Sequence, residues 1–577
     1  MYGWIGKYAV VNLSRGNVSI KDCRLSELKA FIGGRGIGVK VCFENIPRGV
    51  NALSEDNIVV FSSGPVNGTM VPMSGKCIAS SKSPLTGGIF DTCVSGKHSF
   101  YMKSCGFDFV IVKGRASKPV EIVVREGEIE IVESNCWGLD TESTIERLIE
   151  CYGDCLVACI GPAGENLVRF ASVVCEDGGV FGRCGLGAIL GAKNVKAIVF
   201  THGDCEVEVY DTEALYDVVE NMMLRISWSP ALGKVLPRFG TSCLFSVVNF
   251  HEALPARNFR EKALGLGDKI GGDVYNRKFV RGRFSCFMCP VACKRVVEVD
   301  GRLIKGPEFE SIWAIGCNCD VHDLGKLIEV NDKCLRLGLD TISFGGVIAC
   351  FIEMVERGIV SESVPDILDL VEMIAYRRGI GDKLAEGSLR FARSYGAEEY
   401  AMQSKGLELP AYDPREAMGQ ALAYATSNRG GCHLRAYMVA NEILGIPTLI
   451  DRKSILGKAD LVMVHENSSA FVDSMVMCRF SMLEFDDLVY ARALSAVTGI
   501  EYGRKDVQLI GERIWNLERL FNVREGIIGD SLPKRILKVV PLEAMLRDYY
   551  EARGWNGDGI PKVETLRRLG LDEYFKG

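Results

Sequence analysis

Apolar and polar residues follow two different patterns along this chain. Up to about residue 206, short runs rich in β-branched residues are divided by glycine turns such as Ser14-Arg-Gly and Arg125-Glu-Gly. Such runs are typical of β-strands. The pattern predicts strands at residues 8–13, 58–61, 109–112, 120–124, 129–132, 156–160 and 197–201, and one helix near 144–151.

From about residue 207, apolar residues recur every three or four positions, which indicates helices. Glycines such as Gly338, Gly358 and Gly396 mark their ends. The predicted helices are 211–223, 323–337, 342–357, 364–378, 383–395, 415–427, 486–498, 504–521 and 542–553. We therefore predict an α+β protein with a sheet-rich domain (1–206) and two mainly helical domains (207–402 and 403–577), with boundaries set by composition alone.

Composition narrows the class of protein. A chain of 577 residues is expected to form about three to four domains, and 47% hydrophobic with 25% charged residues indicates a globular protein. The net charge of −6 argues against a nucleic-acid partner. No apolar run is long enough for a membrane span. The start, Met1-Tyr-Gly-Trp-Ile-Gly-Lys7, lacks the features of an export signal, so 22 cysteines predict metal ligation in a reducing cytoplasm.

Three of these cysteines are closely spaced, in Cys286-Phe-Met-Cys289-Pro-Val-Ala-Cys293. A C-x2-C-x3-C run with a fourth, distant ligand is typical of a [4Fe–4S] cluster. Structural zinc is an alternative, although zinc sites usually have two C-x2-C pairs, and free buried thiols are another. A radical-SAM site is disfavoured because its cysteine spacing runs in the opposite order.

Four glycine-rich segments of the first domain could face a phosphorylated ligand, because glycine lets backbone N–H groups converge on an anion. They are residues 33–38, 74–88, 93–96 and 178–185. For any single segment, a simple tight turn is the favoured interpretation. The first contains G-x-G without a βαβ context, so a Rossmann site is not indicated. Together they suggest a large cofactor with several contact points.

Several motifs, taken in order along the whole chain, resemble the tungsten-containing aldehyde:ferredoxin oxidoreductases. Besides the opening residues and the cysteine triplet, they are Lys82-Ser-Pro-Leu-Thr-Gly, Gly161-Pro-Ala-Gly-Glu-Asn-Leu-Val, Gly306-Pro-Glu-Phe-Glu310, Gly338-Leu-Asp-Thr-Ile-Ser, Leu409-Pro-Ala-Tyr-Asp-Pro, Asn428-Arg-Gly-Gly-Cys-His433, Gly511-Glu-Arg-Ile-Trp and Arg553-Gly-Trp.

The resemblance implies tungsten, or molybdenum, held by two pterin cofactors on a saddle of β-sheet, without a protein ligand to the metal. It also implies a [4Fe–4S] cluster on Cys286, Cys289, Cys293 and Cys478, and a magnesium ion bridging the pterin phosphates is a further expectation. The cofactor contacts that it implies are Lys76, Cys93, Ser95, Val180, Phe181, Gly182, Arg183, Leu335, Asp340, Asp473 and Arg479.

Some of these positions depart from the best-known members of the family. Lysine at 76 replaces arginine, cysteine at 93 replaces asparagine, serine at 95 replaces glycine and glycine at 179 replaces a second arginine. The two pterin motifs are altered as well: Leu335 stands for aspartate, and Val476-Met477 for Gly-Leu. Asp332 replaces a histidine of the subunit-bridging iron site found in some members, so we do not predict that iron.

The function that the resemblance implies is oxidation of a small aldehyde to its carboxylic acid, with ferredoxin as the electron acceptor. Glu310 would be the general base and His433 would hydrogen-bond the carbonyl oxygen. Taken alone, each has a simpler structural interpretation: a glutamate in a helix cap and a histidine in a loop. Arg435 could contact an anionic substrate, but it is expected to be solvated on the loop. The other histidines lack support. A homo-oligomer, by family default a dimer, is expected.

Three alternatives to this function stay open at this point. The same architecture could work in reverse, as a reductase of an activated acid or an aromatic thioester. The altered pterin motifs also fit an electron-transfer or cofactor-binding paralogue without catalysis of its own. The third alternative is a zinc-stapled scaffold with no redox role.

Overall fold

The computed structural model describes residues 1–299 and 301–575, and its first third is built on two sheets. The described residues form one six-stranded sheet in the order β2-β1-β6-β3-β4-β5 and another in the order β11-β10-β9-β12-β7-β8. The strands of the first are β1 (Lys7–Asn12), β2 (Asn17–Asp22), β3 (Val59–Ser62), β4 (Lys76–Lys82), β5 (Ile89–Ser95) and β6 (Phe109–Lys113). Those of the second are β7 (Val120–Arg125), β8 (Glu128–Glu133), β9 (Cys155–Ile160), β10 (Val173–Cys175), β11 (Val180–Phe181) and β12 (Val195–Thr201).

Both sheets are mixed. Strands β1 and β6 pair in parallel, as do β7 and β12, and the other neighbours are antiparallel. Central strands such as β3 and β9 are buried along their whole length, which explains why they read as continuous apolar runs and not as alternating ones. A further small sheet consists of β15 (Val280–Phe284), β16 (Lys294–Val299) and β17 (Arg302–Lys305).

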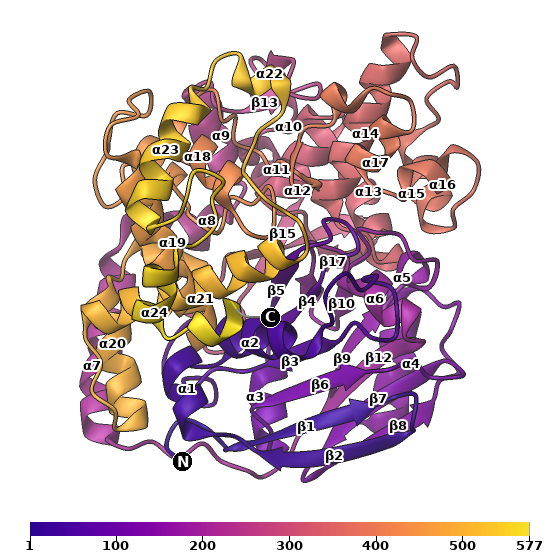
Figure 1. The fold of residues 1–577 in the computed structure, drawn as a ribbon. Coiled ribbons are helices and arrows are strands. Elements are labelled where there is room, and N and C mark those ends of the chain that lie inside the picture. The colour runs from indigo at the N-terminus through magenta and orange to yellow at the C-terminus, as the bar shows by residue number, and fades with distance from the viewer. Residues whose placement is uncertain (300, 576–577) are drawn as a thin grey trace.

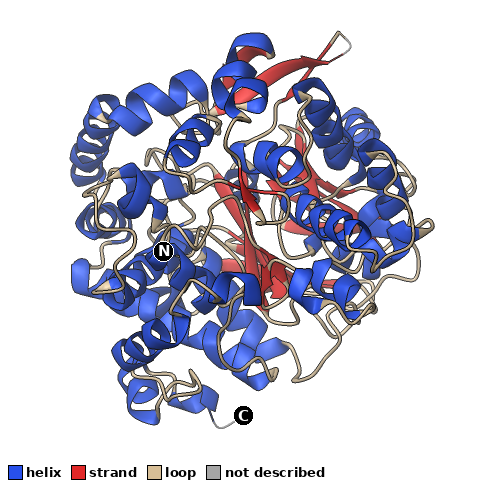
Figure 2. Cartoon of the chain, turned by 90° about the horizontal axis from the view of Figure 1, so that it is seen from above, coloured by secondary structure: helices blue, strands red, loops and turns tan. Residues whose placement is uncertain are grey.

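Helices dominate the chain after the second sheet, and in Figure 1 most of them lie above the two sheets, with α7 and α20 at the left side. The main ones are α7 (Thr212–Trp228), α9 (Cys243–Phe250), α13 (Leu324–Leu337), α14 (Thr341–Glu356), α15 (Ile367–Ala375), α18 (Met418–Thr426), α19 (Lys458–Met475), α20 (Asp487–Thr498), α21 (Arg504–Arg524) and α23 (Leu542–Arg553). Seen from above, they surround the strands (Figure 2). The α+β architecture expected from the sequence is confirmed.

The predicted strands and most predicted helices are present, including α4 (Thr141–Tyr152). The single helix predicted at residues 383–395 is wrong. Residues 383–395 form parts of two short helices, α16 (Ile380–Leu384) and α17 (Ser388–Arg393). Between them Gly387 adopts φ +90°, a conformation that ends a helix and that side chains disfavour.

The prediction that residues 33–38 form a ligand-facing loop is wrong. It begins helix α2 (Gly34–Asn45), whose first ten residues are all buried. Its glycines allow close packing: a Cβ on Gly38 would lie 2.2 Å from Ser80 Oγ on β4, and one on Gly34 would lie 2.4 Å from the carbonyl oxygen of Asp473. The run therefore brings α2 against the first sheet and against α19.

Across residues 1–299 and 301–575, no helix combines the length and hydrophobicity that a membrane crossing requires.

Candidate active site

One cavity of about 380 Å³ brings together most of the functional residues expected from the sequence. It lies where the ends of β4 and β5 meet the cysteine loop and segments of the last third of the chain. The expected residues that line it are Lys76, Cys93, Ser95, Val180, Cys286, Cys289, Cys293, Glu310, His433, Cys478 and Arg479. Residues more than 400 positions apart in sequence, such as Lys76 and Arg479, thus share one site.

The sheet side of the cavity is set by the pairing of β4 with β5. Lys76 lies opposite Ser95, and Ile78 lies opposite Cys93. Residues that face each other across a pair, or that are two positions apart on one strand, point to the same side of a sheet. The register therefore directs the side chains of Lys76, Cys93 and Ser95 toward the same side, at the open end of the hairpin.

The four cysteines are held together through the backbone of Met73. Its N–H donates to the carbonyl oxygen of Met288 (2.7 Å), within the cysteine loop between β15 and β16. Its carbonyl oxygen accepts from the N–H of Cys478 (2.9 Å). One residue of the first domain thus joins the triplet to the distant cysteine, and Cys478 lines the same cavity as the other three.

The cysteine loop has a tightly constrained backbone. Met288 and Ala292 both adopt left-handed conformations, with φ +53° and +49°, which are uncommon for residues with a side chain. The loop also packs directly on Gly75, where a Cβ would lie 2.1 Å from the carbonyl oxygen of Phe287. Among the residues that the structure describes, no three histidine, cysteine or acidic side chains lie close enough to hold a single metal ion.

Glu310 projects into the cavity from the short helix α12 (Phe309–Ser311), which runs into a π-helix at Ile312–Cys317. Its Oε2 accepts a hydrogen bond from the N–H of Ala411 (3.0 Å), whereas its buried Oε1 has no hydrogen-bond partner among the described residues. Burial raises the pKa of Glu310 to about 8. The carboxyl group is therefore balanced between its protonated and ionised forms in mildly alkaline solution.

His433 faces Glu310 across the cavity, with 3.5 Å between Nε2 and Oε1. That separation is at the outer limit of a hydrogen bond, so the two groups are neighbours and not a bonded pair. Burial, with Arg183 and Arg429 nearby, lowers the pKa of His433 to about 3. Its imidazole is consequently neutral near pH 7 and keeps one N–H to donate.

Lys76 is a cation without a bonded partner in the described part of the chain. No hydrogen bond or ion pair of its ammonium is formed there, although Lys76 lines the cavity beside the thiols of Cys93, Cys286 and Cys478. A buried charge is costly unless it is paired. The side chain is thus suited to an anionic group in the cavity.

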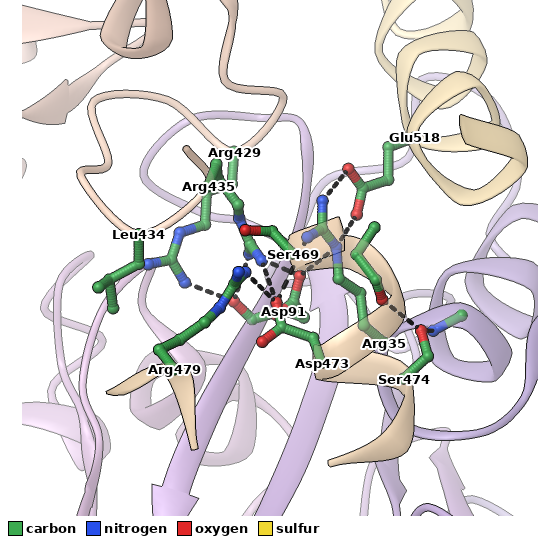
Figure 3. A network of polar contacts seen from close by, with 12 residues as sticks. Arg35, Asp91, Arg429, Leu434, Arg435, Ser469, Asp473, Ser474, Arg479 and Glu518 are labelled. Carbon is green, nitrogen blue, oxygen red and sulfur yellow. Dashed lines mark hydrogen bonds and ion pairs between the residues drawn. The ribbon is translucent and has the colours of Figure 1, made fainter. Parts of the chain in front are cut away.

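A network of charged side chains, most of them buried, includes the cavity residue Arg479 (Figure 3). Asp473 Oδ2 accepts from Arg35 (3.3 Å), Arg435 (3.0 Å) and Arg479 (2.6 Å). Asp91 Oδ1 accepts from Arg435 (2.6 Å). The network, defined as Arg35, Asp91, Arg429, Arg435, Asp473, Arg479 and Glu518, has four arginines for three carboxylates. The surplus positive charge reaches the cavity through Arg479.

The expectation that Arg435 is solvated is wrong. Its side chain is 4% exposed and bridges Asp91 on β5 to Asp473 on α19. Sequence alone could not show this, because both carboxylates are distant in the chain. The residue holds the sheet domain to the last third of the protein.

Replacing Arg435 with methionine is expected to lower the free energy of unfolding by about 3–5 kcal/mol, because it leaves two buried carboxylates short of a partner. Urea unfolding monitored by circular dichroism measures the change. Arg547→Met is the matched control, since that side chain is 78% exposed and its loss should shift the free energy by no more than about 0.5 kcal/mol. Equal effects of the two substitutions would contradict the role given to the network.

Six of the expected cofactor contacts lie outside the lining of the cavity: Phe181, Gly182, Arg183, Leu335, Asp340 and Asp473. Arg183 pairs with Asp340 (3.4 Å) and donates to the carbonyl oxygens of Glu408 and Gly431, so it braces the segment that carries His433. Leu335 lies on α13. The cofactor roles of these six residues stay predictions.

Other cavity residues were not singled out from the sequence. Tyr412 and Tyr437 share a hydroxyl hydrogen bond (2.9 Å), and their rings lie 5.5 and 6.1 Å from the ring of His433. His465, on α19, also lines the cavity. Tyr412 belongs to the motif Leu409-Pro-Ala-Tyr-Asp-Pro, so the sequence could have indicated it as a site residue. His465 lies in none of the motifs, and nothing in the sequence pointed to it.

Two family models match this chain. The model of the aldehyde ferredoxin oxidoreductase N-terminal domain matches residues 8–202, and that of domains 2 and 3 matches residues 217–571. The tungsten-containing aldehyde ferredoxin oxidoreductase of Pyrococcus furiosus is 38% identical over 609 positions, and that of Thermococcus kodakarensis is 36% identical over 607. Both alignments cover 100% of each chain.

A more distant solved structure has the same fold. It is the active-site complex of benzoyl-coenzyme A reductase with 1,5-dienoyl-coenzyme A, at a TM-score of 0.89 and 22% identity, covering 100% of this chain and 98% of that one. With full-length relatives named as oxidoreductases, the protein is an oxidoreductase. The chain belongs to the aldehyde ferredoxin oxidoreductase family.

Proposed function

We propose that the protein oxidises a small aldehyde to the carboxylic acid at a tungsten bis-pterin centre and passes the electrons through a [4Fe–4S] cluster to ferredoxin. The observation that carries the proposal is the single cavity shared by Glu310, His433 and the four cysteines. The full-length relatives named as tungsten-containing aldehyde ferredoxin oxidoreductases support it.

The cysteine spacing along the sequence supports a cluster over zinc. Structural zinc sites usually have two C-x2-C pairs, whereas Cys286, Cys289 and Cys293 follow C-x2-C-x3-C with a distant fourth cysteine, which is typical of a [4Fe–4S] cluster. All four cysteines line one cavity.

The charges around the cavity support an anionic pterin cofactor. Lys76 has no bonded partner in the described part of the chain, and Arg479 brings the surplus charge of the arginine network to the cavity wall. Both would hold phosphate groups, Lys76 as a point charge without bidentate geometry. Bound there, the cofactor would supply the two-electron oxidation, and the cluster would release the electrons singly.

Glu310 and His433 are placed to handle the proton and the carbonyl group of the substrate. The free Oε1 of Glu310 can take a proton from the water molecule that supplies the oxygen of the product. The neutral imidazole of His433 can donate a hydrogen bond to the carbonyl oxygen, which makes the carbon more electrophilic. Tyr412 and Tyr437 form an aromatic wall beside both groups.

The rate of aldehyde oxidation is expected to rise with pH. A general base works in its ionised form, and the pKa of Glu310 is raised to about 8, so kcat/KM should increase about tenfold per pH unit below that value. Bound anions would move the midpoint upward. A kcat/KM profile with a viologen dye as acceptor measures it, and a profile that falls from pH 6 to 8 would contradict the assignment.

Metal analysis of protein purified without air tests the proposal. About one tungsten and four irons per chain, together with dye reduction by one or more of a panel of aldehydes, are the expected results. Iron without tungsten would favour an electron-transfer paralogue, and zinc alone a scaffold. A tungsten or molybdenum centre, bridging magnesium, a homodimer and a cytoplasmic location stay predictions.

A further inference from the structure

One helix beside the cavity, α9, is apolar on both of its faces. Its inward side chains Phe245 and Val248 are completely buried in the hydrophobic core. Its outward side carries Leu244, which is half-buried, Val247, which is 38% exposed, and Phe250, which is 83% exposed. A helix that is apolar all round is normally covered on every side. The outward side of α9 therefore lacks the cover that its composition calls for.

The outward residues of α9 extend from the cavity to the protein surface. Leu244 lines the cavity. Residues three positions apart are neighbours on the surface of a helix, so Val247 lies beside Leu244 and Phe250 lies beside Val247. The six residues from Leu244 to Phe250 span about 9 Å of helix. One wall of the cavity is thus continuous with an exposed apolar surface.

The π-helix η4 (Ala440–Leu444) connects the cavity with the same region. Its first residue, Ala440, lines the cavity, and η4 packs against α9. The loop that follows folds back on η4, because the N–H of Ile450 donates to the carbonyl oxygen of Asn441 (3.1 Å). The loop after η4 is therefore held next to the cavity wall.

This loop places another exposed apolar side chain near the end of α9. Arg452 Nη1 donates to the carbonyl oxygen of His251 (2.6 Å), the residue that follows α9. Leu449, three positions before Arg452, is 63% exposed, and this hydrogen bond keeps it close to the end of the helix. We name these exposed residues and the cavity residue that they continue the apolar strip: Leu244, Val247, Phe250 and Leu449.

Charged side chains close to the strip in sequence are paired with one another. Glu252, two residues after Phe250, pairs with Lys262 (2.5 Å). Lys453, four residues after Leu449, pairs with Glu416 (2.7 Å). These pairs compensate the charges on both sides of the strip, so its surroundings favour an uncharged, apolar occupant.

We infer that the apolar strip holds the hydrocarbon tail of the substrate, and that the protein acts on linear aldehydes with long apolar chains. The inference rests on the proposed function and names the class of aldehyde. The occupant follows from continuity, because the strip begins at a residue of the cavity that also contains Glu310. A chain whose aldehyde group lies at Glu310 covers Val247 and Phe250 only if it is long, and each methylene that it buries favours binding.

Binding of the carboxylate products tests the tail site without turnover. Hexanoate and decanoate are titrated by calorimetry into the protein purified without air. Decanoate should bind at least about tenfold more tightly, since each of its additional methylenes contributes about twofold when one side stays open to water. In the double variant Phe250→Ser/Leu449→Ser, most of this difference between the two acids should be lost.

Turnover of a series of aldehydes tests the same surface during catalysis. With a viologen dye as acceptor, the unaltered protein should show a kcat/KM that rises from butanal to decanal. The double variant Phe250→Ser/Leu449→Ser should lower the ratio of kcat/KM for decanal to that for hexanal by about tenfold. The change should lie in KM and not in kcat, because both side chains are remote from the reacting group and contribute binding alone.

The same pair of residue types, exposed elsewhere, provides the control. Phe575→Ser/Leu303→Ser alters exposed positions on the 3₁₀-helix η6 (Asp572–Phe575) and on β17, and neither residue lines the cavity. The Kd for decanoate and the ratio of kcat/KM values should stay within about twofold of those of the unaltered protein.

Three results would overturn the tail site. They are equal affinities of the unaltered protein for hexanoate and decanoate, equal losses in the two double variants, and a Phe250→Ser/Leu449→Ser variant that binds decanoate normally but has a smaller oligomeric mass by light scattering. The last result would assign the strip to contacts between copies of the chain. If no aldehyde reduces the dye, the proposed function fails, whereas the binding of decanoate still shows whether the strip holds a hydrocarbon tail.

Discussion

Replacing Cys478 with alanine is expected to strip iron from the protein, from about four atoms per chain to fewer than one. The residue lies far from the triplet in sequence yet lines the same cavity, and its N–H is bonded to Met73, which also holds the cysteine loop. In the variant, only three cysteines would be left to bind the cluster, and the ligand from the last third of the chain would be missing. Iron analysis and the absorbance of the anaerobically purified variant measure the loss.

Cys243→Ala is the matched control for this change. Cys243 is half-buried and packs against the same hydrophobic core as Cys478, but it does not line the cavity. Its substitution should leave the iron content near that of the unaltered protein. Full iron content in the Cys478 variant would show that the fourth ligand is another group, and equal loss in both variants would indicate general unfolding.

Replacing Glu310 with glutamine is expected to reduce kcat by about 10²- to 10⁴-fold, the usual contribution of a general base. Glutamine keeps the size of the side chain and can still accept the hydrogen bond from Ala411. It cannot take a proton from water. Tungsten and iron contents should be unchanged, and the rise of kcat/KM toward pH 8 should disappear.

Glu308→Gln separates this role from a general effect of charge. Glu308 lines the same cavity two residues earlier and accepts a hydrogen bond from Thr241 (2.6 Å). Its substitution should change kcat less than about tenfold. Loss of metal in the Glu310 variant would mean that this carboxylate is structural, and similar losses of kcat in both variants would contradict the choice of Glu310 as the base.

The sequence predicted those strands and helices whose apolar residues follow directly from their burial. Strand β9 is buried along its whole length, and α13 has one buried face, so their apolar patterns were informative. Helix α19 was missed because polar residues such as Glu466 and Ser469 are buried in it and interrupt the apolar spacing. Strand β4 was missed for a related reason: Ser80 and Ser81 are small, polar and fully buried.

Site residues that belong to a sequence motif could be predicted. Residues whose partners are distant in sequence could not be predicted from the residues alone. The spacing of Cys286, Cys289 and Cys293 identifies them as candidate metal ligands. Cys478 entered only through family resemblance, because nothing local distinguishes it among 22 cysteines. The buried, ion-paired positions of Arg35 and Arg435 could not be predicted. Their carboxylate partners are distant in sequence and come close only in the folded chain.

The hydrogen bonds of Met73 bear on how the protein matures. A ribosome delivers the triplet and Met73 well before it delivers Cys478, so during synthesis the growing chain would offer only three of the four proposed cluster ligands. With that ligand set, iron loading would be completed only after the last part of the chain has been released and has packed against the earlier part. Maturation would then be post-translational, and truncated chains are expected to emerge without a stably held cluster.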